Sequence, residues 1–238
     1  MNASGAPKIA VIGDGKMGHA VAQLAADAGL VVTAVIGEAR NVRGAGITAE
    51  SLGGASVAIE FTLPSAAADN VRACLRAKCA VVVGTTGWYD ELDSVTRAVR
   101  EAGGALLYAP NFSLGANIFW QVAEYAASLA AYAGGFDAHI AETHHAAKKD
   151  APSGTALELA RRASAAFGRD IPVTSMRVGS VPGTHELLFD GAFEQIRLEH
   201  VARDRRVFAQ GALAAARWLA GRTGVFTMRD VLAGSPTS

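Results

Sequence analysis

The sequence has few cysteines, no excess of either charge and no long apolar run, and each absence excludes a class of protein. Its 238 residues include two cysteines, and 22 basic residues balance 22 acidic ones. Two cysteines build no disulfide framework, and a neutral chain has no general attraction for nucleic acid or membrane surfaces. No apolar run approaches the ~20 residues of a spanning helix, and no signal-peptide pattern opens the chain. We therefore expect a cytoplasmic globular protein without membrane or nucleic-acid partners.

The first half of the chain alternates between short β-branched runs and amphipathic segments. After the first run, Met17, Val21 and Leu24 recur at helical spacing before Gly29 ends the segment. The runs lack polar alternation, as expected for strands buried on both faces. This rhythm predicts an α/β fold with a doubly wound parallel sheet of the Rossmann type, whose strands cover residues 9–12, 31–36, 57–61, 80–83 and 105–108.

The rhythm changes after Pro110 and Asn111. A long helix is predicted over residues 114–131, and a half-buried strand over residues 136–141. Two antiparallel strands are expected at 186–189 and 195–200. A last helix over 211–220 is expected to pack on the first domain, followed by a short strand or turn. We therefore predict two domains: residues 1–111 with 208–238 carry the parallel sheet, and residues 112–207 form a smaller mixed α+β domain.

The segment VIGDGKMG has the spacing Gly-x-Gly-x-x-Gly at Gly13, Gly15 and Gly18. Such glycines let a pyrophosphate approach the backbone at a helix N-terminus, and the last one allows close helix–strand packing. A generic tight turn is the alternative, but the position between a strand and a helix favours dinucleotide binding. The predicted cofactor-binding residues of this loop are Gly13, Asp14, Gly15, Lys16, Met17 and Gly18.

Charged residues after the second strand bear on the choice of cofactor. Glu38 follows the glycines by about 20 residues, where a carboxylate binds the ribose 2′-hydroxyl of NADH. Arg40 and Arg43 could instead bind the 2′-phosphate of NADPH, and all three could be solvated loop charges, so the preference stays open. The loops after the fourth and fifth strands lie where a nicotinamide ring is expected; they contain Gly84, Thr85 and Thr86, and Ala109, Pro110, Asn111 and Phe112.

A cluster of cationic side chains, HHAAKKD, precedes the helix start APSGTA. His144 and His145 are adjacent on an extended segment, so they point to opposite sides; we predict no metal site. A histidine can release a proton near neutral pH, and a lysine offers a cation to a carboxylate. The helix start at Ser153, Gly154 and Thr155 offers N–H groups to another carboxylate. An N-cap with incidental surface charges would not explain the whole cluster.

In these motifs the sequence resembles the 4-hydroxy-tetrahydrodipicolinate reductase family, also called dihydrodipicolinate reductase. The segments GDGKMG, EFTLP, VVGTTG, APNFSLGAN, HHAAKKDAPSGTA and FAQGALAAARWL occur in the family's order. The resemblance runs from residue 8 to about residue 232. Its most specific element is HH-x-x-K-x-DAPSGT.

The resemblance implies a fold, a reaction and a site. The family has a nucleotide domain and a substrate domain whose sheet builds a homotetramer. It reduces a cyclic unsaturated dicarboxylate imine with NADPH or NADH in the diaminopimelate route to lysine. By resemblance, His144 is the proton donor and Lys148 a second one, while His145, Gly154 and Thr155 bind the substrate together with Ser153 at the same helix start. The glycine loop, the Gly84 triplet and the Ala109 segment contact the dinucleotide.

The chain also departs from this family. Its glycine loop is one residue shorter than in many relatives, Gly37 stands where many carry an acidic cofactor-selecting residue, and the segment between Gly168 and Arg177 is short. Lys149 is expected to be a bystander and Asp150 to shape the turn. Polar support for the substrate domain is expected from Arg177, His185, His200 and Arg205. Two other functions are considered: a reductase of another amino-acid-derived imine, such as aspartate or diaminopimelate dehydrogenase, and a dinucleotide sensor without turnover.

Overall fold

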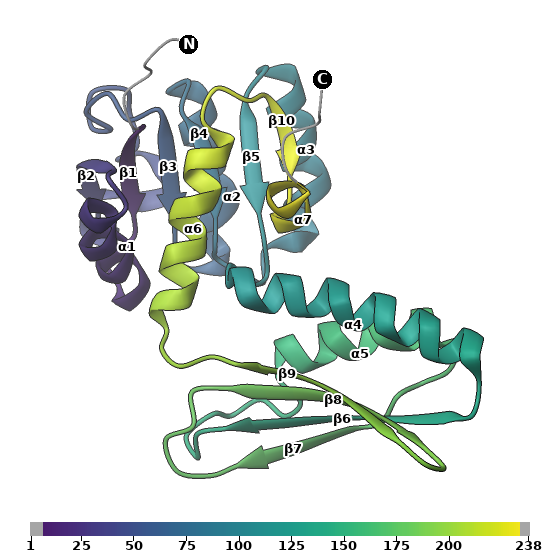
Figure 1. Cartoon of the computed structure of the whole chain (residues 1–238). Helices are drawn as coiled ribbons and strands as arrows, with labels where there is room; N and C mark the ends of the chain where they lie inside the picture. Colours follow the sequence, from purple (N-terminus) through teal and green to yellow (C-terminus); the bar gives the residue numbers. More distant parts are fainter. Residues whose placement is uncertain (1–6, 234–238) are drawn as a thin grey trace. The chain divides into compact units, whose positions relative to one another are not determined.

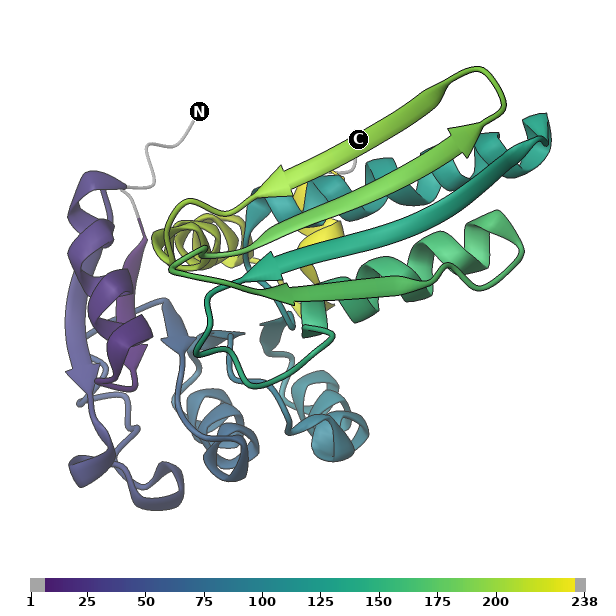
Figure 2. The same ribbon diagram turned by 90° about the horizontal axis from the view of Figure 1, so that it is seen from below.

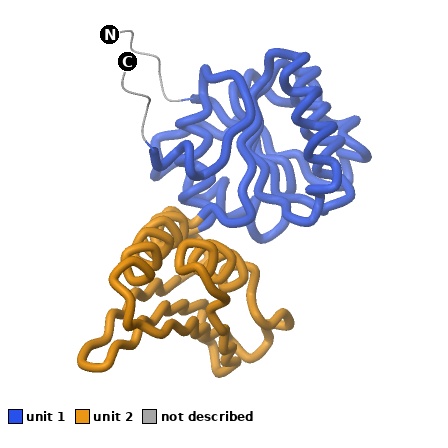
Figure 3. Tube along the Cα trace, turned by 90° about the vertical axis from the view of Figure 1, so that its right-hand side faces the viewer, with its two compact units in different colours: residues 1–112, 208–238 blue, residues 113–207 orange. Residues whose placement is uncertain are grey.

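The structure, a computed structural model, describes residues 7–233, and the chain divides into two compact units. The first consists of residues 1–112 and 208–238, and the second of residues 113–207 (Figure 3). Phe112 belongs to the first unit, so the division falls one residue beyond the sequence-based boundary. Within the described residues, no helix is both long enough and apolar enough to cross a membrane.

A six-stranded sheet forms the centre of the first unit (Figure 1). All neighbouring strands are parallel, in the order β10-β5-β4-β3-β1-β2. The chain leaves β1 for β2 on one side and later returns to β3 on the other, which creates a switch point at the carboxyl end of β1. The strands are β1 (Lys8–Ile12), β2 (Val31–Ile36), β3 (Val57–Glu60), β4 (Ala80–Val83), β5 (Ala105–Tyr108) and β10 (Gly224–Phe226). The predicted doubly wound parallel sheet is confirmed.

Helices cover both faces of this sheet. Apolar side chains of α2 (Pro64–Arg76) and α3 (Leu92–Glu101) join alternate strand residues in one core. On the other face, Gly18 of α1 (Lys16–Asp27) packs against Val11. The helix α6 (Arg206–Leu219) packs so closely against the segment after β5 that a Cβ on Gly211 would lie 1.6 Å from the carbonyl oxygen of Phe112. Short elements complete the unit: η1 (Glu38–Arg40), η2 (Val42–Gly44), η3 (Tyr89–Glu91) and α7 (Met228–Leu232).

The second unit has a four-stranded mixed sheet with two helices on one face (Figure 1). The strands β6 (Phe136–His144), β7 (Val173–Arg177), β8 (Thr184–Gly191) and β9 (Gln195–Val201) are ordered β7-β6-β8-β9. Only the β6–β7 pair is parallel, as Figure 2 shows from below. The helices α4 (Leu114–Ala133) and α5 (Gly154–Phe167) pack on this sheet around a core that includes Trp120, Leu159 and Phe189.

Three elements differ most from the sequence-based prediction, and β8 also extends two residues beyond it at each end. The strand β7 was not predicted, because none of its five side chains is fully buried and no apolar run marks it. The strand predicted over 136–141 continues to His144, since its pairing with β7 extends to the pair His144–Arg177. The last helix begins at Arg206 instead of residue 211. The first two differences concern residues whose strand partners lie far away along the chain.

Candidate functional site

The loop between β1 and α1 can accept an anion. Gly13 has φ +107°, and a Cβ there would lie 2.1 Å from the carbonyl oxygen of Phe61. A Cβ on Gly18 would lie 1.9 Å from the carbonyl oxygen of Gly13, so both positions require glycine. Above Gly15, by contrast, no atom lies within 4 Å of a Cβ position, and no side chain caps α1. This open helix N-terminus fits the pyrophosphate of a dinucleotide.

A pocket of about 510 Å³ adjoins the glycine loop. Asp14, Glu38 and Arg43 all line it, whereas Arg40 donates a hydrogen bond of 2.8 Å to the carbonyl oxygen of Val35. A side chain at Gly37 would collide with the Asp14 carboxylate, so Asp14 fills the space that Gly37 leaves. The pocket therefore presents both carboxylate side chains and a guanidinium group to a ribose, and the choice between NADH and NADPH stays open.

The loops after β4 and β5 meet around Phe61 at the same edge of the sheet. A Cβ on Gly84 would lie 2.0 Å from the Phe61 ring, and the rings of Phe61 and Phe112 meet edge to face at 6.1 Å. Thr85 is buried, and its hydroxyl accepts a hydrogen bond of 2.7 Å from the backbone of Thr62. Ala109 is also buried, whereas Thr86 and Pro110 are exposed and Asn111 is half-buried. The structure thus brings these predicted cofactor residues to the edge that carries the glycine loop.

In the second unit, the end of β6 carries the histidine pair. Ala138, Ile140, Glu142 and His144 lie on the buried face of the strand, because side chains alternate along it. His145 follows the strand and is half-buried. The two histidines therefore face different environments, as the sequence predicted from their adjacency.

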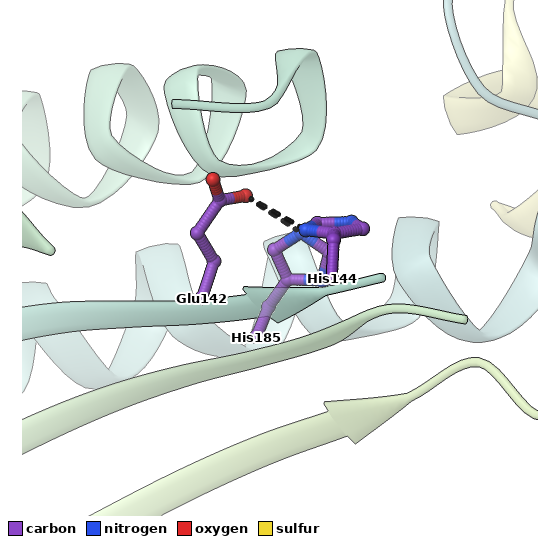
Figure 4. A group of neighbouring side chains, drawn as sticks. All are labelled: Glu142, His144 and His185. Carbon is purple, nitrogen blue, oxygen red and sulfur yellow. Dashed lines mark ion pairs between the residues drawn. The ribbon is translucent and has the colours of Figure 1, made fainter. Parts of the chain in front are cut away.

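Glu142 is the centre of a hydrogen-bonded cluster on this face. Its Oε1 accepts hydrogen bonds from the Ser153 backbone N–H (3.0 Å), the Ser175 hydroxyl (2.8 Å) and Nη2 of Arg177 (2.8 Å). Its Oε2 lies 3.4 Å from Nδ1 of His144 and 3.6 Å from Nε2 of His185. Figure 4 shows the carboxylate directed at the two imidazole rings. One buried carboxylate thus links β6, β7, β8 and the start of α5.

The protonation states follow from this burial and hydrogen bonding. Burial by itself would raise the pKa of Glu142, but hydrogen bonds from Ser153, Arg177 and Ser175 outweigh it and lower the pKa to about 2. Burial lowers the pKa of His185 to about 4, with a further contribution from His144. Burial also lowers the pKa of His144; Glu142 opposes this shift, while Lys148 and Arg177 add to it. At neutral pH the cluster therefore contains an ionised Glu142 and a neutral His185.

The same three side chains are spaced for a metal ion, since their donor atoms lie within 4.8 Å of one another. The charge around them argues against one. The Arg177 guanidinium already pairs with Glu142 at 2.8 Å, and Lys148 is near enough to lower the pKa of His144. A second cation would have to overcome both charges. The absence of a metal stays a prediction.

The turn that follows β6 presents Lys148. Hydrogen bonds from Ala146 N–H to the Gly179 carbonyl (3.1 Å) and from Arg177 to the Asp150 carbonyl fix its two ends. Nζ of Lys148 lies 2.7 Å and 2.9 Å from the two carboxylate oxygens of Asp150. Lys149 is exposed. The ammonium group of Lys148 is therefore held by an exposed carboxylate.

The start of α5 completes the site. Ser153 is its N-cap, and its hydroxyl accepts a hydrogen bond from Ala156 N–H and lies 3.2 Å from Nε2 of His185. Ser153 is buried, and its contacts are with Glu142, His185 and Ala156, so the geometry gives it a structural role at the start of α5. Its contact with substrate stays a prediction. Gly154 has open space around its Cβ position. The carbonyl of Thr155 accepts a hydrogen bond from the Trp120 indole at 3.2 Å.

Sequence reasoning missed Glu142 and Ser175. Arg177 and His185 were expected to be polar support, and both do contact the Glu142 carboxylate. His200 lies beyond His185, with ring centroids 6.4 Å apart, and stacks on Phe119. Arg205 is exposed. The alternation of side chains along β6 was the signal that could have placed Glu142 beside His144.

Comparisons with known proteins agree with this architecture. Residues 7–112 match the family description "Dihydrodipicolinate reductase, N-terminus", and residues 115–232 match "Dihydrodipicolinate reductase, C-terminus". A 4-hydroxy-tetrahydrodipicolinate reductase of Thiobacillus denitrificans is 35% identical over 94% of this chain and 98% of its own. One from Methanoculleus marisnigri is 42% identical over 74% of this chain and 75% of its own.

Solved structures share the fold. A dipicolinate-bound dihydrodipicolinate reductase from Paenisporosarcina sp. TG-14 superimposes with a TM-score of 0.79 at 24% identity, covering 93% of this chain and 97% of that one. A probable dehydrogenase from Thermotoga maritima reaches a TM-score of 0.59 at 12% identity, covering 96% and 90%. At these identities the likeness shows the fold alone. Together with the two family matches, which span nearly all of the described residues, the sequence comparisons show that the chain belongs to the dihydrodipicolinate reductase family.

Proposed function

We propose that this chain reduces 4-hydroxy-tetrahydrodipicolinate to tetrahydrodipicolinate, with loss of water, using NADPH or NADH in the diaminopimelate route to lysine. The observation that carries the proposal is the second unit's site: a buried His144 beside the Glu142 carboxylate, the ammonium of Lys148 and the start of α5 lie around one strand end. Relatives that bear this reductase name cover most of the chain.

His144 is the proton donor in this proposal. When bound, the reduced nicotinamide supplies a hydride to the conjugated imine, and the ring must then take up a proton. Burial lowers the pKa of His144 below that of a free imidazole, so its cationic form is a stronger acid. Lys148, in the turn that follows β6, is the second proton donor in this proposal. The loss of water takes a proton from a ring carbon and gives one to the leaving hydroxyl, and hydride addition then takes up one further proton. His144 and Lys148 together therefore need to supply one net proton.

The substrate's two carboxylates need cations and N–H donors. Lys148 offers a cation, and the first turn of α5 offers backbone N–H groups together with the positive end of the helix. Gly154 lacks a side chain that would hold a carboxylate away from them. His145, outside the strand and half-buried, completes the substrate contacts with Thr155, while Ser153 supports them from below.

The dinucleotide is held by the first unit in this proposal. Its pyrophosphate lies on Gly13 to Gly18, and its adenosine ribose lies in the pocket with Glu38 and Arg43. The nicotinamide end lies against the loops of Gly84 to Thr86 and Ala109 to Phe112. The open N-terminus of α1 and the obligatory glycines support this assignment.

We also propose that the protein is a homotetramer and is located in the cytoplasm. The sheet of the second unit exposes apolar side chains that a monomer would leave in water, among them Met176, Phe193 and Ile196. Analytical ultracentrifugation of wild type and of a Met176→Glu, Ile196→Glu double variant tests this. A wild-type monomer at micromolar concentration would contradict the tetramer.

The function is tested by steady-state kinetics with the fresh condensation product of pyruvate and aspartate semialdehyde. We expect oxidation of NADPH or NADH only when this product is present. His144→Gln and Lys148→Gln should each lower kcat at least ~100-fold, while Lys149→Gln serves as the matched control and stays near wild type. Turnover with aspartate or diaminopimelate instead would favour another imine reductase, and no turnover with any of them would favour a sensor.

A further inference from the structure

The mechanism leaves one buried charge unused. Glu142 is ionised, yet its side chain has no exposure to solvent, so it cannot touch the substrate. Placing a charge in a protein interior is unfavourable unless the charge is paired and hydrogen-bonded. The partners of Glu142 therefore indicate what the charge does.

The two oxygens of this carboxylate have different partners. Donors from two elements hold Oε1: Ser153 at the start of α5, and Ser175 with Arg177 on β7. With Oε1 fixed, Oε2 can only point toward the imidazoles, 3.4 Å from Nδ1 of His144. Among the described residues, neither Oε2 nor this Nδ1 has a hydrogen-bond partner. The separation is an ion-pair distance that a small shift would turn into a hydrogen bond.

From this geometry we infer that Glu142 is a positioning residue: it holds His144 with Nδ1–H toward Oε2, so that Nε2 is the atom that gives the proton to the substrate. The inference rests on the proposed function and specifies the atom on which it depends. A carboxylate behind a histidine fixes both the tautomer and the ring orientation in this way.

The surroundings of Nε2 agree with this assignment. A Cβ on Gly183 would lie 3.0 Å from Nε2 of His144, so only the missing side chain at Gly183 leaves that edge of the ring uncrowded. Gly183 is also fixed in place, since its carbonyl accepts a hydrogen bond of 2.8 Å from Ala202 N–H. The ring therefore has one edge against a carboxylate and the other beside a glycine.

The charges around His144 give Glu142 a second effect. The groups that face the imidazole are Glu142 on its own strand, Lys148 and Asp150 in the turn, Arg177 on β7 and His185 on β8. Lys148 and Arg177 both disfavour the imidazolium, and a neutral His185 does not stabilise it. Glu142 is the buried anion that opposes them, so its loss should make His144 harder to protonate.

A Glu142→Gln variant tests the inference because the surrounding hydrogen-bond donors fix the orientation of the new amide group. Ser153, Ser175 and Arg177 all donate, so the amide oxygen should take the place of Oε1 and the NH2 group should face Nδ1 of His144. We expect kcat to fall at least ~10-fold while KM changes by less than ~2-fold, since the lost interaction acts on the proton donor. The alkaline limb of the kcat/KM profile should move to lower pH.

The controls separate positioning from folding and from the proposed function. Glu186→Gln, on β8, is the matched variant and should keep wild-type kinetics; Glu142→Asp keeps the charge and should recover part of kcat. Nitrogen-15 spectra of the wild type, with His144 assigned by its loss in His144→Gln, should show Nδ1 protonated in the neutral ring, and this readout needs no turnover. A wild-type ring protonated on Nε2, or a Glu142→Gln enzyme with unchanged kcat and pH profile, overturns the inference. An inactive wild type with Nδ1 protonated would instead refute the proposed function alone.

Discussion

The ionised Glu142 should contribute to stability in a pH-dependent way that can be isolated by one substitution. Its pKa is about 2 in the folded chain against 4.5 for a free carboxyl. As pH falls, the unfolded chain takes up this proton first, so the contribution is fully present above pH 4.5 and is lost as pH falls toward 2.

The magnitude follows from the two pKa values. At full strength the difference corresponds to about 3 kcal/mol. Arg177, one of the partners, is 17% exposed, so water screens part of the interaction and we take about half of that value. Between pH 5 and pH 3 the screened contribution of Glu142 should decline by about 1 kcal/mol.

The assay is urea denaturation of wild type and Glu142→Gln at pH 5 and pH 3, at one protein concentration. The wild type should lose about 1 kcal/mol more unfolding free energy between the two pH values than the variant does. The comparison removes what the two proteins share, including most of the destabilisation from the neutral His185, whose pKa of about 4 acts in the same direction. Equal losses in both proteins would refute the view that Glu142 is an anion held by Ser153, Ser175 and Arg177.

Three further predictions follow from the geometry of the first unit. Gly15→Ala should leave the melting temperature unchanged, because its Cβ meets open space, yet raise the dinucleotide Kd at least ~10-fold by blocking the pyrophosphate; unchanged affinity in a fluorescence titration would contradict the phosphate site. Arg43→Ser should raise KM for NADPH about tenfold and leave KM for NADH nearly unchanged if Arg43 binds the 2′-phosphate; equal effects on both cofactors would exclude that role. Gly211→Ala should lower unfolding free energy by at least ~2 kcal/mol through collision with the Phe112 carbonyl, whereas Gln210→Ala, on the same helix, should change it little in the same urea titration.

The parts of the fold and site that could be predicted from sequence are those fixed by neighbouring residues. The glycine loop was predictable because Gly13, Gly15 and Gly18 lie close together in the sequence, and backbone sterics forbid a side chain at Gly13 and Gly18. The N-cap at Ser153 was predictable because its capping contact joins two residues that are close in the sequence, Ser153 and Ala156. Strands without polar alternation indicated a sheet buried on both faces, and the α/β rhythm indicated that this sheet is parallel and doubly wound.

Glu142 shows what local patterns cannot supply. Its partners Ser153, Ser175 and Arg177 follow it by 11, 33 and 35 residues. Two of them lie on β7, which itself has no apolar run to mark it. A carboxylate in an alternating strand ordinarily belongs to the solvent face. Alternation along β6 indicates the face of Glu142, but the pairing of β7 with β6 is what brings Ser175 and Arg177 to it.

The ion-pair partners of the cationic side chains also change how the charge of the site is interpreted. Arg177 is paired with Glu142, and Lys148 with Asp150, so these pairs leave little unbalanced charge in the site. These two pairs are not equivalent. Breaking the buried pair would leave an uncompensated charge at a cost of several kcal/mol, whereas an exposed pair contributes only about 0–1 kcal/mol. Asp150 is 57% exposed, so a substrate carboxylate can replace it on Lys148 at little cost. In the proposed function, recognition of a dianion therefore falls to Lys148 and the start of α5, while Arg177 stays with Glu142, the residue inferred to position His144.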